Sequence, residues 1–280
     1  MSQTETSVKS IEIIGIGLVT GLPSTVTLVP AVLDSGVRFT LNGVTIPASP
    51  EFVADANRGV TLAKDGQMLV LVEHFLAACG MTGFLDWDVE IQGAPELPIL
   101  DGSAIDWVKP IQSLNLPHAP KKLISLMQSI SFIHPERSHV QCHALPHESG
   151  LKVTCLVDFP HPELEKRWLS FDFSQPDFDC LEAIAPARTF GFVSELPALQ
   201  AQGLAKGVSL DNTLGLTEEG GYTTTLRMPD ECIRHKILDF IGDMTLCGIP
   251  VLRMNAHFIL MHSGHQSHIE FGKLLQKSFA

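Results

Sequence analysis

Short strand-like segments dominate both halves of this sequence, and each half contains few segments that resemble helices. In the first half these runs lie near residues 11–14, 25–29, 36–41, 60–62, 68–71 and 86–91, and in the second near 124–133, 140–144, 151–159 and 170–173. Helices are predicted at 72–79, ended by Gly80, at 103–114 and around 179–183. Because a strand-rich half with few helices occurs twice, we expect an α+β fold with two similar domains, each a sheet packed on helices.

The length of the chain, 280 residues, suits two domains of ordinary size. Residues 117–122 are the candidate linker, so an N-terminal domain is predicted at 1–120 and a C-terminal domain at 121–280. Hydrophobic residues make up 45% of the chain and charged residues 18%, which favours globular order over long disorder.

Charge, cysteines and hydropathy exclude several classes of protein. The formal net charge of -12 argues against a nucleic-acid partner, because a phosphate backbone binds basic surfaces. The six cysteines form no Cys-x-x-Cys pair, which indicates reduced, buried thiols and no zinc ribbon or disulfide framework. The first nine residues are polar and no run of 18 apolar residues follows, so we expect a cytoplasmic chain without a transmembrane segment. Nothing in the sequence identifies a protein partner.

The clearest helix begins at Pro229-Asp230-Glu231 and is predicted to stop at Gly248. Asp230 suits the N-cap and Glu231 the positive end of the helix dipole. Helical spacing places five apolar residues on one side: Ile233, Ile237, Phe240, Ile241 and Met244. His235, Asp239 and Asp243 follow one another along the other side. His235 and Asp239 are four residues apart, close enough to hold one metal ion, although a solvated His-Asp pair is the ordinary alternative.

Glu73 and His74 add a third possible ligand and an adjacent carboxylate. A hydrolytic zinc site needs three protein ligands, an open position for water and a base. The segment His262-Ser263-Gly264-His265 offers an imidazole on a turn that suits a proton donor. A competing hypothesis makes His262, His265 and His268 the metal ligands, although they cannot all share one face of a strand.

The segment Gly15-Ile16-Gly17, with Asp34 further on, imitates a dinucleotide-binding turn. The next glycine, Gly21, is one position late, and the residues that should open a helix include Pro23 and alternate like a strand. We therefore expect no phosphate-binding helix here.

Six segments together carry a resemblance to a known family. They are Gly15-Ile16-Gly17-Leu18, Val72-Glu73-His74-Phe75-Leu76-Ala77-Ala78, Ala94-Pro95-Glu96-Leu97-Pro98-Ile99-Leu100-Asp101-Gly102-Ser103-Ala104, Ala187-Arg188-Thr189-Phe190-Gly191-Phe192, Arg234-His235-Lys236-Ile237-Leu238-Asp239-Phe240-Ile241-Gly242-Asp243, and Ser263-Gly264-His265. In this order they resemble the UDP-3-O-acyl-N-acetylglucosamine deacetylases of lipid A synthesis, over residues 11–275. The resemblance implies two similar α+β domains whose helix layers face each other, with a zinc site between them.

The resemblance also implies the role of each site residue. The zinc ligands would be His74, His235 and Asp239, and Fe²⁺ is an alternative metal for such a site. Glu73 would be the general base, and His265, supported by Asp243, the proton donor. The remaining assignments are Thr189 as oxyanion stabiliser, Phe190, Lys236 and Ser209 as substrate contacts, and Leu18, Leu196, Leu199, Leu204, Ala205 and Leu210 as lining of an acyl passage built by an insert at about 193–216.

Four positions depart from the family pattern. Val19 stands where the family has His, Leu71 where it has Thr, Val208 where it has Gly, and His268 where it has Asn. All four are expected to flank the cleft.

The activity implied by the resemblance is zinc-dependent hydrolysis of the N-acetyl group of UDP-3-O-acyl-N-acetylglucosamine, the committed step of lipid A synthesis. One alternative is a zinc deacetylase of the same fold that acts on another N-acetylated sugar or nucleotide sugar. The other is a non-catalytic metal-binding homologue, against which the intact Glu73, His265 and Asp243 argue.

Overall fold

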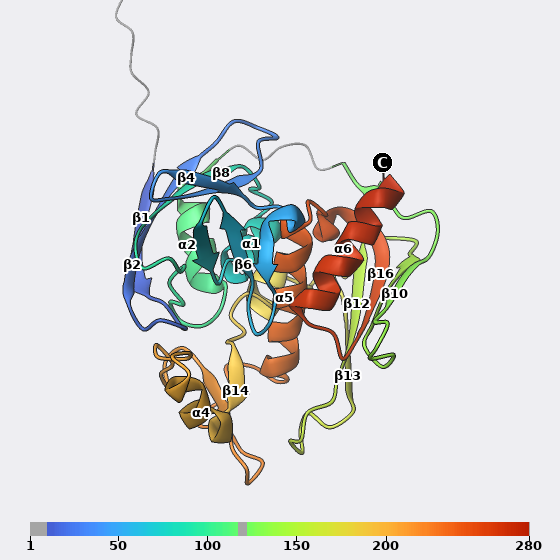
Figure 1. Cartoon of the computed structure of the whole chain (residues 1–280). Helices are drawn as coiled ribbons and strands as arrows, with labels where there is room; N and C mark the ends of the chain where they lie inside the picture. The colour runs from blue at the N-terminus through green and yellow to red at the C-terminus, as the bar shows by residue number, and fades with distance from the viewer. Residues whose placement is uncertain (1–9, 117–121, 280) are drawn as a thin grey trace, which may run out of the picture.

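The computed structural model describes residues 10–116 and 122–279, and it has the mixed α+β architecture that the sequence predicts (Figure 1). The predicted division at 120/121, and all of the predicted linker except Lys122, lie outside the described residues. The first half contains β1 (Ile11–Ile16), β2 (Pro23–Pro30), β3 (Val37–Leu41), β4 (Val44–Pro47), β5 (Val53–Asp55), β6 (Thr61–Lys64), β7 (Gln67–Val70), α1 (Glu73–Thr82), β8 (Trp87–Gly93) and α2 (Ile105–Ser113).

The second half contains β9 (Ile124–Ser125), β10 (Ile130–Ile133), β11 (Gln141–Pro146), β12 (Leu151–Val157), β13 (Arg167–Asp172), α3 (Cys180–Ala183), β14 (Phe190–Phe192), α4 (Leu196–Ala201), β15 (Leu214–Leu216), α5 (Glu231–Leu246), β16 (Met254–Met261) and α6 (His265–Phe279). Short 3-10 turns lie at Pro50–Phe52, Val193–Glu195 and Val251–Arg253. None of the helices among the described residues is long and apolar enough to cross a membrane.

The two main sheets have the same strand plan. The first has the order β1-β2-β8-β3-β4, and the second has the order β10-β11-β16-β12-β13 with β9 added beside β16. Along these two paths only β3 with β8 and β12 with β16 are parallel. In each half one helix precedes the central strand and another follows it: α1 and α2 around β8, α5 and α6 around β16. The two halves therefore repeat one α+β plan.

Side-chain alternation explains which face of each sheet is covered. Along β16, Met254, Ala256, Phe258 and Leu260 are buried and their neighbours are less so, as expected for a strand with one face on a core. The helices lie between the two sheets, with α1 and α5 at the centre (Figure 1). Almost every residue of these two helices is buried, so their polar side chains are enclosed in the protein interior.

Two glycines allow α1 and α5 to approach each other closely. A Cβ atom at Gly242 would overlap the backbone oxygen of Glu73, and one at Gly80 would lie 2.5 Å from Thr245 Oγ1. The prediction that Gly80 ends the first helix is wrong, because α1 continues to Thr82 and closes at Gly83, which has φ 76°. Gly80 is needed for the helix contact instead.

The start of α5 also differs from the prediction. Asp230 has φ 55° and makes no capping hydrogen bond, and its carboxylate pairs with Arg167 at 3.1 Å. Glu231 makes a buried ion pair with Arg188 at 2.8 Å. Ion pairs therefore tie the helix start to the rest of the chain, and the Asp230 side chain does not cap the helix.

Several elements were not predicted, and the prediction that no phosphate-binding helix follows the glycines at 15–21 is confirmed. The run 124–133 is broken into β9 and β10, and local sequence patterns do not predict β4, β5, β16 or α6. The small βαβ insert that the family resemblance implies is present as β14, α4 and β15. The glycines after β1 lead into antiparallel β2, with Ile11 opposite Leu28, so no dinucleotide-binding helix follows. No disulfide links the cysteines of the described residues, and five of the six are buried.

Candidate active site

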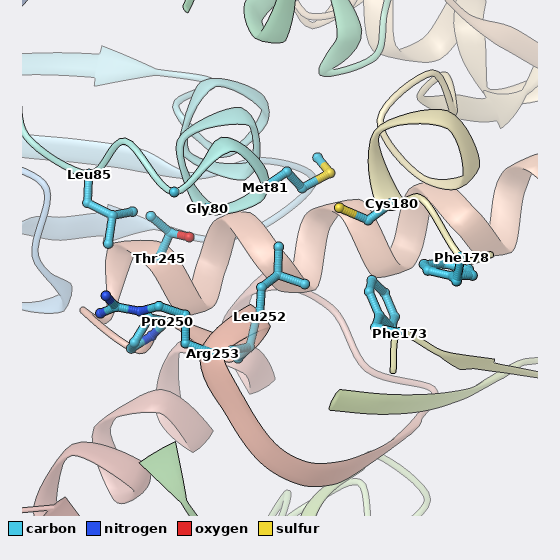
Figure 2. Close-up of a pocket in the computed structure, with 12 residues that line it drawn as sticks. Gly80, Met81, Leu85, Phe173, Phe178, Cys180, Thr245, Pro250, Leu252 and Arg253 are labelled. Carbon is cyan, nitrogen blue, oxygen red and sulfur yellow. The ribbon is translucent and has the colours of Figure 1, made fainter. Parts of the chain in front are cut away.

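A cleft of about 830 Å³ lies at the N-terminal end of α1, beside the first turns of α5 and the start of α6. The predicted site residues that line it come from separate parts of the chain: Leu18, Glu73, His74, Thr189, Phe190, His235, Lys236, Asp239 and His265. A second cavity of about 210 Å³ lies toward the C-terminal ends of α1 and α5 (Figure 2). No histidine or carboxylate is among the described residues that line it, so the candidate acid, base and metal-binding groups belong to the larger cleft.

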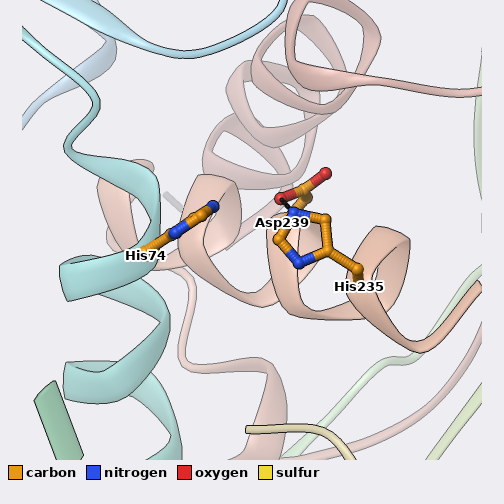
Figure 3. Close-up of side chains that lie close together, drawn as sticks. All are labelled: His74, His235 and Asp239. Carbon is orange, nitrogen blue, oxygen red and sulfur yellow. Dashed lines mark ion pairs between the residues drawn. The ribbon is translucent and has the colours of Figure 1, made fainter. Parts of the chain in front are cut away.

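His74, His235 and Asp239 converge in this cleft (Figure 3). His74 lies in the first turn of α1, whereas His235 and Asp239 lie one turn apart on α5. One ligand atom from each of the three lies within 4.8 Å of the others, and among the described residues this is the one such group of three or more. All three side chains are buried, so the alternative of a solvated His-Asp pair is wrong.

The hydrogen bonds of the three residues fit a bound cation. His235 Nδ1 donates to the carbonyl oxygen of Ala187 at 3.0 Å, and burial lowers the pKa of His235, so its Nε2 carries a lone pair. That lone pair faces Asp239 Oδ1 at 3.3 Å, and this oxygen is buried without a hydrogen-bond partner. Burial and the nearby His235 lower the pKa of His74 to about 3, so its imidazole is neutral too. Two acceptors that face each other in a buried site favour a positive ion between them.

Lys236 contacts this group directly. Its ammonium donates to Asp239 Oδ2 at 2.8 Å. Since Lys236 binds Oδ2, Oδ1 is the oxygen of Asp239 that remains for a cation. The lysine therefore helps to fix the orientation of this carboxylate.

Glu73 is the first residue of α1 and is buried beside the three converging side chains. Burial raises the pKa of Glu73 to about 7, although the nearby positive charge of His265 and the hydrogen bond from Val60 N–H, at 3.0 Å, oppose this shift. A carboxyl group with a pKa near neutrality is suited to accept and release a proton.

The sequence predicted His265 on a turn, but it is the first residue of α6. Its Nδ1 donates to both carboxylate oxygens of Asp243, at 2.9 and 3.0 Å, while its Nε2 lies 3.9 Å from Asp239 Oδ2. Burial opposes a charge on this imidazole, but the carboxylates of Asp243 and Asp239 outweigh burial and raise the pKa of His265 to about 9. The ring is therefore protonated near neutral pH and suited to donate a proton.

The competing hypothesis of a ligand set made of His262, His265 and His268 is wrong. His268 points its Nδ1 at Asp243, at 2.8 Å, and Ser263 donates to its Nε2 at 2.9 Å. Both ring nitrogens of His268 are therefore used away from any common metal position.

Thr189 is held in the cleft by its backbone. Its N–H donates to Gly102 O at 2.7 Å, and its carbonyl oxygen accepts from Leu214 N–H at 2.9 Å. The neighbouring Arg188 is buried and binds Glu231 on α5, which fixes the same segment to the helix that carries two of the converging side chains. This attachment explains how the motif at 187–192 places both the Ala187 carbonyl and the Thr189 hydroxyl.

The motif at 94–104 supports the cleft without lining it. Glu96 is fully buried and accepts hydrogen bonds from Val19 N–H and from Thr20 N–H and Oγ1 at 2.7 to 2.9 Å. These bonds fix the loop that carries Leu18. Asp101 pairs with Arg227, which joins the two halves of the chain.

The insert forms a small βαβ unit in which β14 and β15 pair in parallel and α4 lies between them in sequence. Phe190 and Leu18 line the cleft, but Leu196, Leu199, Leu204, Ala205, Ser209 and Leu210 are not among its lining residues. Leu210 is 61% exposed and Leu204 is 37% exposed, so these two side chains face solvent.

Other residues of the cleft were not predicted. They include Arg58, Arg137, Phe159, Phe192 and Glu195, with Arg58 and Glu195 joined by an ion pair of 2.9 Å. They come from loops or short elements whose local sequence has no periodic pattern, so only the three-dimensional arrangement identifies them. Of the four departures from the family pattern, Leu71 lines the cleft, whereas Val19, Val208 and His268 do not.

Comparisons with known proteins agree with the geometry. The family model of UDP-3-O-acyl N-acetylglycosamine deacetylase (LpxC) matches residues 4–277. The UDP-3-O-acyl-N-acetylglucosamine deacetylase of Thermodesulfovibrio yellowstonii is 39% identical over 263 residues, which cover 93% of this chain and 87% of that protein. The enzyme of the same name from Nitratidesulfovibrio vulgaris is 37% identical, with 99% and 89% covered, and that from Myxococcus xanthus is 36% identical, with 90% and 79% covered. This chain therefore belongs to the UDP-3-O-acyl-N-acetylglucosamine deacetylase family.

Proposed function

We propose that this chain hydrolyses the N-acetyl group of UDP-3-O-acyl-N-acetylglucosamine, with the free amine and acetate as products. Family membership supports this reaction. The observation that carries it is the cleft that joins three converging metal-binding side chains to Glu73 and His265.

A divalent cation would be held by His74, His235 and Asp239, and zinc is the metal that suits two imidazoles and a carboxylate, with Fe²⁺ as the alternative. When bound, such a cation supplies Lewis acidity, which lowers the pKa of a water molecule and polarises a carbonyl group. The Ala187 carbonyl holds the tautomer of His235 that presents Nε2 to the cation.

The side chains of the cleft then accept and donate the protons of the reaction. Glu73 takes the proton of the attacking water as the water oxygen bonds to the acetamide carbon. The Thr189 hydroxyl donates a hydrogen bond to the oxygen on which negative charge develops. His265, held by Asp243, gives its Nε2 proton to the amide nitrogen as the carbon–nitrogen bond breaks, and acetate leaves.

Substrate contacts are assigned to side chains that line the cleft: Leu18, Phe190 and Lys236. Leu18 and Phe190 offer apolar surface to the acyl chain and the sugar, whereas Lys236 offers a positive charge to an oxygen of the nucleotide sugar. Leu196, Leu204, Ser209 and Leu210 would contact the substrate only if the insert moved toward the cleft. The buried thiols suit a reducing compartment, and we place the reaction in the cytoplasm.

The second candidate function is deacetylation of another N-acetylated sugar or nucleotide sugar. The observation in its favour is Leu71 in the cleft wall. The family resemblance leads us to expect Thr at this position, so the wall lacks a hydroxyl group there. Acetate release from UDP-3-O-acyl-N-acetylglucosamine of several acyl lengths, compared with the unacylated sugar nucleotide, separates the two.

We expect the zinc-loaded protein to release acetate from the acylated substrates faster than from the unacylated sugar nucleotide, and the Glu73→Ala protein to release almost none. Turnover of the unacylated compound alone would favour the second candidate. Binding of zinc without turnover of any of these compounds would identify a non-catalytic homologue.

A further inference from the structure

His268 is a fully buried histidine on α6. It lies one turn after His265 on α6, and its ring packs edge-on against Phe240 of α5 with centroids 5.3 Å apart. It does not line the cleft. His268 can therefore affect the reaction only through a neighbouring residue that it contacts.

That neighbour is Asp243. The Oδ2 atom of Asp243 accepts one hydrogen bond from His268 Nδ1, at 2.8 Å, and one from His265 Nδ1, at 2.9 Å. The other ring nitrogen of His268 accepts a hydrogen bond from the Ser263 hydroxyl at 2.9 Å. Because the Asp243 carboxylate can only accept, the proton of a neutral His268 ring lies on Nδ1, and this leaves Nε2 as the acceptor for the Ser263 hydroxyl.

We propose that His268 is a positioning residue of the deacetylase reaction: its Nδ1–H donor and Ser263 fix the rotation of the Asp243 carboxylate and, through it, the direction of His265. The inference rests on the proposed function. Asp243 is fully buried, and within the described part of the chain the hydrogen bonds to its carboxylate come from His265 and His268. Without His268, His265 would be the sole partner of the group that orients it.

Geometry explains why a second donor matters. A carboxylate that is held only by the imidazole it orients can turn together with that imidazole, whereas a donor from a packed ring fixes its plane. His265 directs Nε2 toward the cleft, so a rotation of its ring displaces the proton that the departing amine needs. His268 thus acts on the reaction through Asp243 and His265, without contacting the reacting atoms.

Asparagine at position 268 gives a matched control. Its side-chain NH₂ group lies at the same bond separation from the backbone as Nδ1 of a histidine, so Asn can donate to the same oxygen. We expect His268→Asn to keep kcat within about threefold of the wild-type value, and His268→Leu, which keeps bulk but has no donor, to lower kcat about 10-fold or more. KM and the zinc content should stay unchanged in both, because His268 touches neither the cleft nor the metal-binding side chains.

Steady-state kinetics and metal analysis of the zinc-loaded proteins decide between positioning and packing. A kcat of His268→Leu equal to that of the wild type overturns the proposal, and so does an equal loss in both variants, since that would indicate packing alone. If His268→Leu does not fold, His268→Met takes its place.

A measurement on the unaltered holoenzyme is independent of turnover. Nitrogen-15 NMR of the histidine rings should show that the His268 ring carries its proton on Nδ1 and that Nε2 is unprotonated. A proton on Nε2 would remove the donor to Asp243 and overturn the proposal. This result is obtained whether or not the protein releases acetate, so failure of the proposed function and failure of this inference are distinguishable.

Discussion

Glu73 and His265 are two buried groups whose pKa values both rise, one to about 7 and the other to about 9. The causes differ: burial raises the pKa of the carboxyl group, whereas neighbouring carboxylates overcome burial at the imidazole. At neutral pH this leaves a carboxyl group that exchanges its proton readily beside an imidazole that keeps its own. A base and an acid within one cleft are what amide hydrolysis needs.

The role of the base is tested by Glu73→Gln, which keeps the shape and removes the proton acceptor. We expect kcat to fall by about 10²- to 10⁴-fold, because general base catalysis contributes a factor of that size. Bound zinc should stay at one equivalent, since Glu73 is not among the converging ligands. Glu12→Gln, at an exposed position of β1, is the matched control. Full acetate release by the Glu73→Gln protein would contradict this role.

Among the elements, α1 and α5 place the site. Gly242 lies opposite the backbone of Glu73 and Ala77, so a methyl group at this position would push against backbone atoms that cannot turn away. Gly80 lies at the same helix contact, but the closest atoms there belong to the side chains of Thr245 and Ile241.

We expect Gly242→Ala to lower the free energy of unfolding by about 1–3 kcal/mol, the usual cost of overpacking, and to weaken zinc binding because His74 moves relative to α5. Gly80→Ala, the matched variant, should lose less stability and keep its zinc affinity, since a side chain can rotate. Urea unfolding and competition with a metal chelator measure both quantities. Equal stability of the Gly242→Ala protein and the wild type would show that the helices are free to separate.

The attachment of α5 gives a prediction about pH. Burial alone would raise the pKa of Glu231, but the hydrogen bonds from Arg188 and Arg227 outweigh burial and hold it below its ordinary value of 4.5. A carboxyl group with a lowered pKa in the folded state stabilises the fold above its unfolded pKa, and this stabilisation is lost as the pH falls through the folded value.

Glu231→Gln should therefore cost about 3–5 kcal/mol at pH 7, because it leaves the buried Arg188 without its counter-charge. The difference from the wild type should shrink as the pH falls below 4.5. Asp88→Asn, which breaks the exposed pair with Arg38, is the control and should cost less than about 1 kcal/mol. Unfolding free energies at a series of pH values test this, and a difference that does not change with pH would contradict it.

Local pattern explains which elements the sequence predicts. Strands with one buried face, such as β2 and β8, alternate visibly, and the amphipathic spacing of residues 233–244 identifies α5. The end of α1 was misplaced because a glycine required for helix contact has the same sequence signal as a glycine that ends a helix. The cap of α5 was wrong because Asp230 has a partner 63 residues away, which no local pattern contains.

The sequence motifs identify the candidate site residues, but they do not show that these residues lie close together in the fold. His235 and Asp239 share a helix face, so their proximity follows from spacing alone. His74 lies on another helix, and Arg58 and Arg137 lie on loops without a pattern, so their approach depends on the packing of the two halves. The function of His268 in holding Asp243 was equally hidden, because it depends on how α6 packs against α5.

At the scale of the whole molecule, the proposed metal site joins the two halves of the chain. His74 comes from the first half, and His235 and Asp239 come from the second. A cation bound to all three should stabilise the folded chain by mass action, because the unfolded chain does not bring these side chains together.

Removal of the metal with a chelator should therefore lower the Tm, and one equivalent of zinc should restore it. Differential scanning calorimetry of the chelated and reloaded protein measures this change. Asp239→Asn, which weakens the site, should show a smaller response to zinc. An identical Tm with and without metal would mean that the cation does not bind the folded chain at this site.

The central claim, metal-dependent deacetylation at this one site, is tested most directly by titrating the chelated protein with zinc while acetate release from UDP-3-O-acyl-N-acetylglucosamine is followed. The rate should rise from near zero and reach its maximum at one equivalent of zinc per chain, and the Asp239→Ala protein should stay inactive at that ratio. Full turnover by the chelated protein, or recovery in the Asp239→Ala protein at one equivalent, would contradict the account.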